Sequence, residues 1–341
     1  MRGAVVTRYG GPEVMEIRDI PIPQLKAGQI LVRVRAIGLN FADIFGRLGV
    51  YPHTPSPPFV PGLEFSGDVV AVAPDVTKFR GRERVMGYSR LGSHADYVAL
   101  GCHFATAVPP SMSYPEAAAF LATGMSAYHG IVRLANLRRG EKILIHAAAG
   151  GVGLAAIQIA RRIGAEIFAT AGTDEKLRTA AKHGADHLIN YRDQDFAAEV
   201  RRMTGGYGVD VVMDSVGGEV YKKSWQLLAG MGRYVLYGVS AVTGKGGLNR
   251  LKAAATFSLM RPLFPPSLIS ANKGIFGFNL GTLTGVEGYF AEAAKELLRY
   301  HDEGSLKPVI GTVFPFEQIV DAHTFLQTRQ SVGKVVVNVA V

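Results

Sequence analysis

The sequence contains little cysteine and no long apolar runs. Its 341 residues include a single cysteine, Cys102, which excludes an intramolecular disulfide and any zinc site built from clustered cysteines. No apolar stretch follows a basic segment near the start, and no uninterrupted apolar run reaches about 18 residues. We therefore expect neither a signal peptide nor a membrane-spanning segment, and we predict a cytoplasmic protein.

Charge is plentiful but is not gathered into blocks. The formal net charge is +9, from 37 Lys and Arg against 28 Asp and Glu. The basic residues are scattered along the chain, which does not favour nucleic acid as a partner, and an anionic cofactor would also favour a positive potential. A composition of 48% hydrophobic and 19% charged residues is ordinary for a folded protein, and the length allows two domains.

The chain does have one strong glycine motif. Residues 142–173 have the pattern of a short apolar strand, a tight turn and an amphipathic helix. The turn carries A-x-G-x-x-G at Ala148, Gly150 and Gly153, a dinucleotide-binding fingerprint in which the first glycine is replaced. Gly150 lets amides approach a pyrophosphate, Gly153 lets the helix pack on the strand, and the helix N-terminus attracts phosphate. A glycine-rich turn without a ligand is the alternative for this motif taken alone.

Strand and helix patterns alternate from this motif onwards. Strands are expected at 142–147, 166–171, 187–191, 209–214, 233–237 and 274–278, with helices at 174–183, 195–203 and 219–228. Six strands joined in this way predict an α/β fold with a doubly wound parallel sheet of the Rossmann type.

An apolar, proline-rich insert at 240–273 lies between the last two of these strands. It is too short and too rich in proline to span a bilayer. We expect it to cover the site or to form a subunit contact, and a role at a membrane surface remains open.

The residues before and after this region have a different pattern. Ile30, Val32, Val34 and Ala36 face one way and Leu31, Arg33 and Arg35 the other, which is typical of a half-solvated antiparallel sheet. Further strands are expected at 68–73, 93–100 and 103–108, and a helix at 115–132 marks the domain boundary. The tail has helices expected at 287–301 and 316–328 and strands at 309–314 and 334–339. The first domain is therefore split: 1–122 and 281–341 enclose a domain at 123–280.

Several segments together resemble the zinc-independent quinone oxidoreductase branch of the medium-chain dehydrogenase/reductase superfamily. They are GLNFADIFGRLGVYP, VPGLEFSG, HAAAGGVG, AGTDEK, HLINY, DSVGG and GKVVV. The resemblance covers the whole chain and implies a GroES-like, mostly β barrel-like catalytic domain at 1–122 and 281–341, with an NADP-binding Rossmann domain at 123–280. The insert followed by GIFGFNLG is similar to the subgroup of the synaptic-vesicle membrane protein homologues.

The resemblance also bears on metal binding. Zinc-dependent relatives use a cysteine and a histidine where this chain has Asn40 and Leu63, neither of which is a reasonable zinc ligand. The nine histidines also lack the spacing of a metal-binding box. We expect no metal, and therefore hydride transfer from NADPH to an acceptor that is already electrophilic, a quinone or an α,β-unsaturated carbonyl.

The catalytic candidates lie close together in the sequence. The resemblance places Asn40 near the nicotinamide, and Asp43 and Tyr51 are candidate active-site polar groups that could donate hydrogen bonds to the acceptor oxygen. Asn40 or Asp43 could instead cap a short helix. Glu64 is flanked by apolar residues, so it must be paired if it is buried.

The remaining site candidates are cofactor contacts that the resemblance implies. They are Asn40, Thr123, Gly150, Gly151, Val152, Gly153, Gly172, Thr173, Lys176, Tyr191, Gly238, Val239, Phe278, Leu280, Arg329 and Lys334. No carboxylate stands at the end of the second Rossmann strand, where NAD-specific domains usually have one, so NADPH is expected. Lys176 and Tyr191 resemble the family's phosphate-binding pair, although Lys176 could be a solvated helix lysine.

Two other functions remain open. One is an enoyl-thioester reductase, and the other is a cofactor-binding protein that acts at a membrane surface or on RNA. The expected partners are a small-molecule electrophile and a second copy of the chain. The resemblance implies a dimer with the strand at 274–278 or the insert at the two-fold interface, and an interface there would bury the apolar insert.

Overall fold

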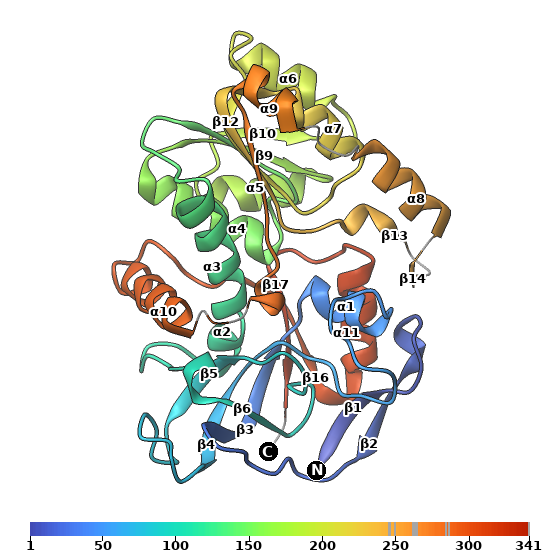
Figure 1. Cartoon of the computed structure of the whole chain (residues 1–341), viewed down its shortest axis with the longest axis vertical. Coiled ribbons are helices and arrows are strands. Elements are labelled where there is room, and N and C mark those ends of the chain that lie inside the picture. Colours follow the sequence, from blue (N-terminus) through green and yellow to red (C-terminus); the bar gives the residue numbers. More distant parts are fainter. Residues whose placement is uncertain (245–246, 249, 261–264, 284, 286, 340–341) are drawn as a thin grey trace. The chain divides into compact units, whose positions relative to one another are not determined.

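The chain forms two compact units, shown in Figure 1. The computed structural model describes residues 1–244, 247–248, 250–260, 265–283, 285 and 287–339. Unit 1 contains Met1–Thr123, Gly281–Arg299 and Lys307–Val341, and unit 2 contains Gly124–Leu280 and Tyr300–Leu306. Unit 1 therefore draws on segments from both sides of unit 2.

Unit 2 is built on a six-stranded sheet. Its strands are β8 (Lys142–Ile145), β9 (Glu166–Ala171), β10 (His187–Asn190), β11 (Val209–Asp214), β12 (Leu228–Leu236) and β15 (Gly274–Gly277). Every neighbouring pair is parallel, in the order β10-β9-β8-β11-β12-β15. The predicted α/β fold with a doubly wound parallel sheet is confirmed.

Helices connect these strands. They are α4 (Gly151–Ile163), α5 (Asp174–Lys182), α6 (Phe196–Met203) and α7 (Glu219–Trp225). Phe196 of α6 and Tyr221 of α7 share one apolar core with Phe168 and Tyr234 of the sheet, while α4 and α5 pack on β8, β9 and β10. Successive strands are added on one side of β8 and then on the other, so the strand order reverses between β8 and β11. In open α/β sheets the ligand binds at such a reversal, at the carboxyl ends of the strands.

Unit 1 is organised around a mostly antiparallel sheet. Its strands are β3 (Gln29–Gly38), β4 (Glu64–Val72), β5 (Arg84–Tyr88), β6 (Tyr97–Gly101), β7 (Ala105–Ala107), β16 (Ile310–Pro315) and β17 (Lys334–Asn338). The sheet runs β16-β17-β3-β4-β5-β7, with β6 also paired to β3, and β1 (Arg2–Val6) pairs with β2 (Met15–Asp19). The predicted alternation on β3 is confirmed, because Ile30, Val32, Val34 and Ala36 are buried. Its other face is only half-buried.

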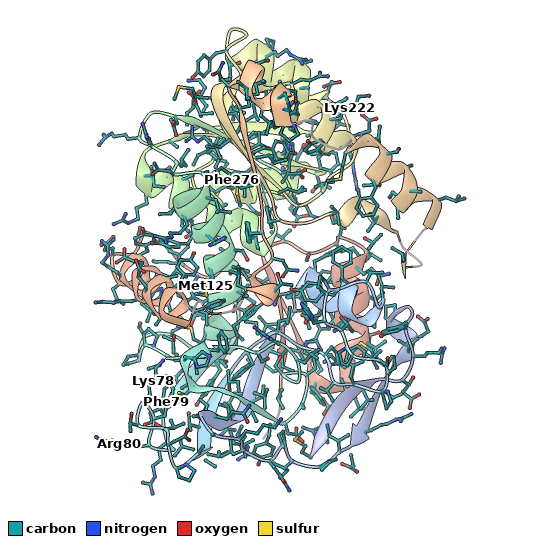
Figure 2. The ribbon with its side chains drawn as sticks, in the orientation of Figure 1. Lys78, Phe79, Arg80, Met125, Lys222 and Phe276 are labelled. Carbon is teal, nitrogen blue, oxygen red and sulfur yellow. The ribbon has the colours of Figure 1, made fainter. Side chains whose placement is uncertain are left out.

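The remaining main helices are α1 (Phe41–Arg47), α2 (Tyr114–Ala118), α3 (Leu121–Tyr128), α10 (Glu287–Asp302) and α11 (Ile319–Gln327). Within unit 1, α1 packs against α11 although the two are far apart in the sequence. Met125, labelled in Figure 2, is a buried residue of α3. Figure 2 also shows Lys78 and Arg80 on the loop between β4 and β5, where the apolar Phe79 between them is buried and the two basic residues are exposed.

Several predicted boundaries in the first part of the chain are wrong. The strand predicted at 68–73 begins at Glu64, because a buried pair allows a charged residue inside the strand. The strand predicted at 93–100 begins at Tyr97. The strand predicted at 103–108 is the shorter β7, because His103 lies in a 3-10 helix. Strand β5 was not predicted. The single helix predicted at 115–132 is α2, α3 and a π-helix at His129–Leu134.

Two predictions for unit 2 also need correction. The helix predicted at 219–228 ends at Trp225, and the strand predicted at 233–237 starts earlier, because Leu228 pairs with Val209 at the start of β12. The insert contains α8 (Arg250–Leu259), α9 (Pro265–Ala271) and the hairpin strands β13 (Thr243–Gly244) and β14 (Gly247–Leu248). Its residues 245–246, 249 and 261–264 lie outside the described residues. Within the described part of the chain, no helix is both long and apolar enough to cross a membrane.

Candidate active site

The predicted site residues form one set on each unit. In unit 2 they follow the carboxyl ends of the parallel strands: Gly150 to Gly153 follow β8, Gly172 and Thr173 follow β9, Tyr191 follows β10, Gly238 and Val239 follow β12, and Phe278 and Leu280 follow β15. Because parallel strands end at the same edge of a sheet, the fold brings this set together at that edge.

The glycine turn between β8 and α4 has the geometry of an anion cradle. Gly150 is the N-cap of α4, and the first helical bond runs from the Leu154 N–H to the Gly150 carbonyl at 2.9 Å. The amides of Gly151, Val152 and Gly153 precede this bond at the positive end of a 13-residue helix. A Cβ on Gly153 would lie 2.5 Å from the Ala147 carbonyl oxygen, so only glycine fits there. The turn therefore fits a pyrophosphate.

Ala148, the departure from the fingerprint, does not disturb this turn. It is fully buried, and its N–H donates to the Thr170 carbonyl at 3.1 Å. The positive φ that a tight turn needs falls on Ala147, at 50°. The missing glycine is thus replaced by an alanine in a left-handed conformation next to it.

The end of β9 gathers hydroxyl and basic groups around a glycine. A Cβ on Gly172 would lie 2.7 Å from the Tyr191 hydroxyl and 3.2 Å from Arg192 Nε, so glycine allows both to approach the strand end. Thr173 is the N-cap of α5 and its hydroxyl accepts from the Lys176 N–H at 3.3 Å. Lys176 is half-buried, whereas Tyr191 and Arg192 are exposed. Arg192 was missed in the sequence, although it directly follows Tyr191.

The loops after β12 and β15 adjoin this edge. Gly238 lies against Ser215, because a Cβ there would come within 3.0 Å of the Ser215 carbonyl oxygen. The Phe278 ring stacks on the Tyr237 ring with centroids 5.9 Å apart. The backbone N–H of Phe278 donates to the Leu236 carbonyl. Leu280 is buried. These predicted contacts are packed in place, so the edge is largely preformed.

In unit 1 the predicted residues meet around a buried ion pair. Lys334 Nζ lies 2.5 Å from Glu64 Oε2 and 2.7 Å from Asn40 Oδ1. Both ion-pair partners are buried, and Glu64 also accepts the Ala122 N–H at 2.7 Å. The expectation that a buried Glu64 must be paired is confirmed. Lys334, predicted as a cofactor contact, fixes the orientation of the Asn40 amide.

Asp43 takes part in the N-terminal cap of α1 and has a raised pKa. Its Oδ2 accepts the Asn40 N–H at 2.8 Å at the start of α1, as the capping alternative expected. Burial raises the pKa of the Asp43 carboxyl to about 7, although the N–H groups of Asn40 and Leu63 and the Lys334 ammonium lower it. Asp43 is therefore a carboxyl that exchanges a proton near neutral pH.

Tyr51 has a partner that the sequence did not reveal. Its hydroxyl is hydrogen-bonded to that of Tyr88, a buried residue at the end of β5. Burial raises the pKa of Tyr88 well above its usual range, and the nearby Tyr51 and Asp43 contribute. Tyr51 itself is half-buried. Tyr88 went unnoticed because β5 is a short strand after a charged, glycine-containing loop.

Behind Asp43 lies a second group of buried polar side chains. His94 Nε2 is 3.9 Å from Asp43 Oδ2, and the His94 ring meets the His323 ring edge-on with centroids 5.2 Å apart. Arg47 is fully buried and donates to Gln327 of α11. Burial lowers the pKa of His94 to about 3 and that of His323 well below its usual value, so both imidazoles are neutral.

Two predicted cofactor contacts have other placements. Thr123 of α3 is buried, and its hydroxyl donates to the carbonyl of Ala119, the C-cap of α2, at 2.8 Å. Arg329 follows α11 in a left-handed conformation, with φ at 59°. Their roles as cofactor contacts remain predictions.

The side chains near Asn40 do not fit a zinc ion. The Asn40 amide oxygen accepts from the Lys334 ammonium, whose charge would repel a metal there, and Leu63 is buried and has no donor atom. Among the described residues, no three His, Cys, Asp or Glu side chains are grouped to hold a metal. We therefore assign no step to a metal.

Two known families match two segments of the chain. Residues 26–128 match the alcohol dehydrogenase GroES-like domain, and residues 183–337 match a family described as zinc-binding dehydrogenase. The first match covers β3 to β7 of unit 1, and the second covers β10 to β15 of the parallel sheet together with β16 and most of β17.

Whole-chain relatives agree with these matches. The synaptic vesicle membrane protein VAT-1 homolog of Rattus norvegicus is 35% identical over 98% of this chain and 83% of its own length. The quinone oxidoreductase of Homo sapiens is 31% identical over 95% of this chain and 93% of its own. The solved structure of the Escherichia coli quinone oxidoreductase complexed with NADPH has a TM-score of 0.88 and 29% identity, covering 99% of this chain and 100% of its own.

Proposed function

Because the chain belongs to the medium-chain dehydrogenase/reductase superfamily, we propose that it is an NADPH-dependent reductase that delivers a hydride to a quinone or an α,β-unsaturated carbonyl without zinc. The observation that supports this most is the carboxyl edge of the unit 2 sheet, with its glycine cradle and with Gly172 and Thr173, rather than an acidic residue, directly after β9. A Rossmann edge of this kind suits a phosphorylated dinucleotide.

In this proposal each group at the edge has a binding role. The amides of Gly151, Val152 and Gly153 hold the pyrophosphate. Tyr191 and Arg192, which lie beside Gly172, and Lys176 in the first turn of α5 hold the 2′-phosphate of NADPH, which an acidic residue at this place would repel. When bound, the cofactor supplies the hydride, and the protein supplies position and charge.

Unit 1 supplies the polar groups for the acceptor. Tyr51 is half-buried, and its hydroxyl can donate to an acceptor oxygen as negative charge develops there. Asn40 is held by Lys334, so its amide is preorganised at no further cost during the reaction. Asp43, with its pKa near 7, is the carboxyl suited to proton transfer at neutral pH.

The direct test is an assay of NADPH oxidation against quinones, enones and enoyl thioesters. We expect turnover with quinones or simple enones. Turnover confined to enoyl thioesters and inhibited by coenzyme A in competition with substrate would favour the thioester reductase. No turnover with any acceptor, together with salt-sensitive RNA retention or co-sedimentation with vesicles, would contradict the proposal.

Cofactor preference is tested at the end of β9. Lys176→Ala should lower the efficiency with NADPH about ten- to a hundredfold and leave NADH almost unchanged, because a charge-assisted phosphate contact is worth about 1.5–3 kcal/mol. Arg192→Ala should act in the same direction. Lys182→Ala, an exposed lysine in the last turn of the same helix, is the matched control. Equal losses with both cofactors would contradict a 2′-phosphate role.

We also propose a homodimer in the cytoplasm. β15 is an edge strand that pairs only with β12 among the described strands. Its residues Ile275 and Phe276 are half-buried, and Phe276 is labelled in Figure 2. An open edge of this kind can pair with a second copy. Light scattering should give twice the 36.5 kDa chain mass. A monomer at micromolar concentration would contradict the dimer.

A further inference from the structure

The turn between β8 and α4 contains a residue in a conformation that its own side chain does not favour. Ala147 has a φ of 50°, in the left-handed region that residues other than glycine rarely adopt. Asn136 and Asn272, which are also left-handed in unit 2, have short polar side chains that can support this conformation by local hydrogen bonds. Alanine has no such group. The conformation of Ala147 must therefore be held by its neighbours.

The backbone reverses its hydrogen-bonding direction at Ala147. The His146 N–H donates to the Met213 carbonyl of β11 at 3.0 Å. The Ala148 N–H donates to the Thr170 carbonyl of β9 at 3.1 Å, although β9 lies on the opposite side of β8 from β11. In a regular strand the N–H groups of residues two positions apart point to the same side. The chain must therefore turn over between these two amides, and the left-handed Ala147 makes this turn.

Thr170 and His146 fix the turn from both ends. The Thr170 hydroxyl lies 2.9 Å from His146 Nδ1, so Thr170 binds the residue before Ala147 through its side chain and the residue after it through its carbonyl. The other ring nitrogen, Nε2, lies 2.8 Å from Ser224 Oγ of α7. The His146 ring is therefore held between a strand and a helix, and it cannot rotate without losing a buried hydrogen bond.

The burial of these side chains indicates more than stabilisation. His146, Thr170 and Ser224 are all buried, at a level of the sheet where Val, Ile and Leu are usual. Burial lowers the pKa of His146 to about 4, so the neutral ring has one N–H and one acceptor nitrogen. Hydroxyls can donate or accept, so both nitrogens are satisfied in either tautomer. A fully satisfied polar network adds little net stability but fixes one geometry.

The left-handed turn decides where the carbonyl before α4 points. The Ala147 carbonyl accepts the Gly150 N–H at 2.9 Å, and its oxygen lies 2.5 Å from the place that a Cβ on Gly153 would take. This carbonyl is therefore turned towards the start of α4 and is satisfied there. The amides after Gly150, which precede the first bond of the helix, are then oriented to bind a pyrophosphate.

We infer that His146 and Thr170 are positioning residues for the dinucleotide: they hold Ala147 in its left-handed conformation and so shape the turn that binds the pyrophosphate. The pair replaces the backbone freedom that the first glycine of the usual fingerprint would give. In this role both residues act through Ala147, and neither contacts the cofactor. The inference rests on the proposed function, because that proposal assigns the turn to NADPH.

The test measures NADPH binding by calorimetric titration without an acceptor, after thermal unfolding has shown that each variant folds. Thr170→Val removes the hydroxyl but keeps the carbonyl and the shape of the side chain. It should raise the Kd for NADPH about tenfold, which is close to the value of one hydrogen bond. A Thr170→Val protein with the wild-type Kd overturns the inference.

Thr204→Val is the matched control. The half-buried Thr204 also uses its hydroxyl within unit 2, donating to the Val200 carbonyl at 2.7 Å, but it follows α6 and precedes the amino end of β11. The pyrophosphate is expected at the carboxyl ends of the strands. Thr204→Val should therefore lower the unfolding temperature and leave the Kd unchanged, and equal increases in Kd for the two valine variants overturn the inference.

The Ala147→Gly substitution supplies a result that a merely structural role would not give. Glycine adopts the left-handed conformation without support from neighbours. The double variant Ala147→Gly with Thr170→Val should therefore return the Kd for NADPH to within about threefold of the wild-type value. A double variant that binds NADPH as weakly as Thr170→Val alone overturns the inference.

Two histidine variants keep the inference testable if Thr170→Val does not fold. His146→Asn places an amide near the Nδ1 position and can keep the bond to Thr170, whereas His146→Gln reaches towards Ser224 in place of Nε2. The first should keep the Kd within about threefold of wild type, and the second should raise it about tenfold. Equal Kd values overturn the inference.

Failure of the proposed function gives a different result. Because the titration contains no acceptor, a wild-type protein that binds NADPH but reduces no quinone, enone or enoyl thioester overturns the proposed reductase. The positioning role then still stands or falls with the Kd values of the variants, so the two failures are separable.

Discussion

Each unit buries a histidine beside its predicted site residues, but the two are held in opposite ways. In unit 2, His146 bonds Thr170 through Nδ1 at 2.9 Å and Ser224 through Nε2 at 2.8 Å. In unit 1, both ring nitrogens of His94 are buried without a partner among the described residues. Burial alone therefore does not assign a role to a histidine. A ring with both nitrogens satisfied stabilises the fold, whereas an unsatisfied ring costs stability and needs another explanation.

The carboxylates differ in the same way. Asp214 of unit 2 accepts N–H bonds from Val216 and Gly217 and the Tyr234 hydroxyl. Asp43 of unit 1 leaves Oδ1 buried without a partner in the described structure. The buried polar groups near the predicted cofactor edge of unit 2 are thus hydrogen-bonded, while unit 1 keeps unsatisfied groups near the predicted acceptor residues. The predictions below test this contrast, from the largest expected effect to the smallest.

The largest effect should come from the buried ion pair of unit 1. Lys334→Met leaves Glu64 as an unpaired charge in the core and should lower the free energy of unfolding of unit 1 by about 3–5 kcal/mol. Chemical denaturation measures this loss. The double variant Lys334→Met with Glu64→Gln should recover much of it, and a double variant as unstable as the single would contradict the pairing argument.

The two buried histidines should respond differently to the same substitution. His146→Leu leaves the buried hydroxyls of Thr170 and Ser224 without their partner and should cost about 2–4 kcal/mol. His94→Leu breaks no hydrogen bond and should change stability by less than about 1 kcal/mol. Urea unfolding of both variants at pH 7.5 measures the two changes in the free energy of unfolding. Equal losses would contradict the argument that His146 is satisfied by hydrogen bonds and His94 is not.

Asp43 should make the stability of unit 1 depend on pH. Its pKa is raised in the folded protein, from 3.8 to about 7, so its stabilising contribution is complete below about pH 4 and is lost as the pH rises through 7. Asp43→Asn removes this loss. The free energy of unfolding of the variant relative to that of the wild type should be about 2–3 kcal/mol higher at pH 8 than at pH 5. The same difference at both pH values would contradict the raised pKa.

The smallest effect should be that of an exposed ion pair in unit 2. Lys223 lies 2.8 Å from Asp195, with side chains 42% and 51% exposed. Lys223→Ala should therefore cost less than about 1 kcal/mol, and less still in high salt. A loss as large as that of Lys334→Met would show that burial does not decide the value of these pairs.

The Rossmann part of the fold was largely predictable from sequence. Buried parallel strands such as Glu166–Ala171 and Val209–Asp214 are mostly apolar, and their predicted bounds match the structure. Prediction failed where apolar periodicity continued across a boundary, as at Leu228. The sequence analysis also missed the short strand β5 and the helices of the insert, where the apolar residues show little periodicity.

The candidate site was predictable only where it is local in sequence. The glycine turn and the capping of α1 by Asn40 and Asp43 lie within a few residues. The pair of Glu64 and Lys334, 270 positions apart, follows from the pairing of β17 with β3 and has no local signal. The Tyr88 contact and the His94–His323 pair depend in the same way on tertiary structure.

The split of unit 1 also has a consequence for how the chain folds during synthesis. Strand β3 emerges early from the ribosome, but β17, its partner, is made about 300 residues later. Until then Glu64 has no ammonium beside it, and its burial is unfavourable. Unit 2 between them can complete its sheet with nearer partners. The nascent chain should therefore form unit 2 first, and acquire the predicted acceptor residues of unit 1 in their final arrangement only when Lys334 has been synthesised.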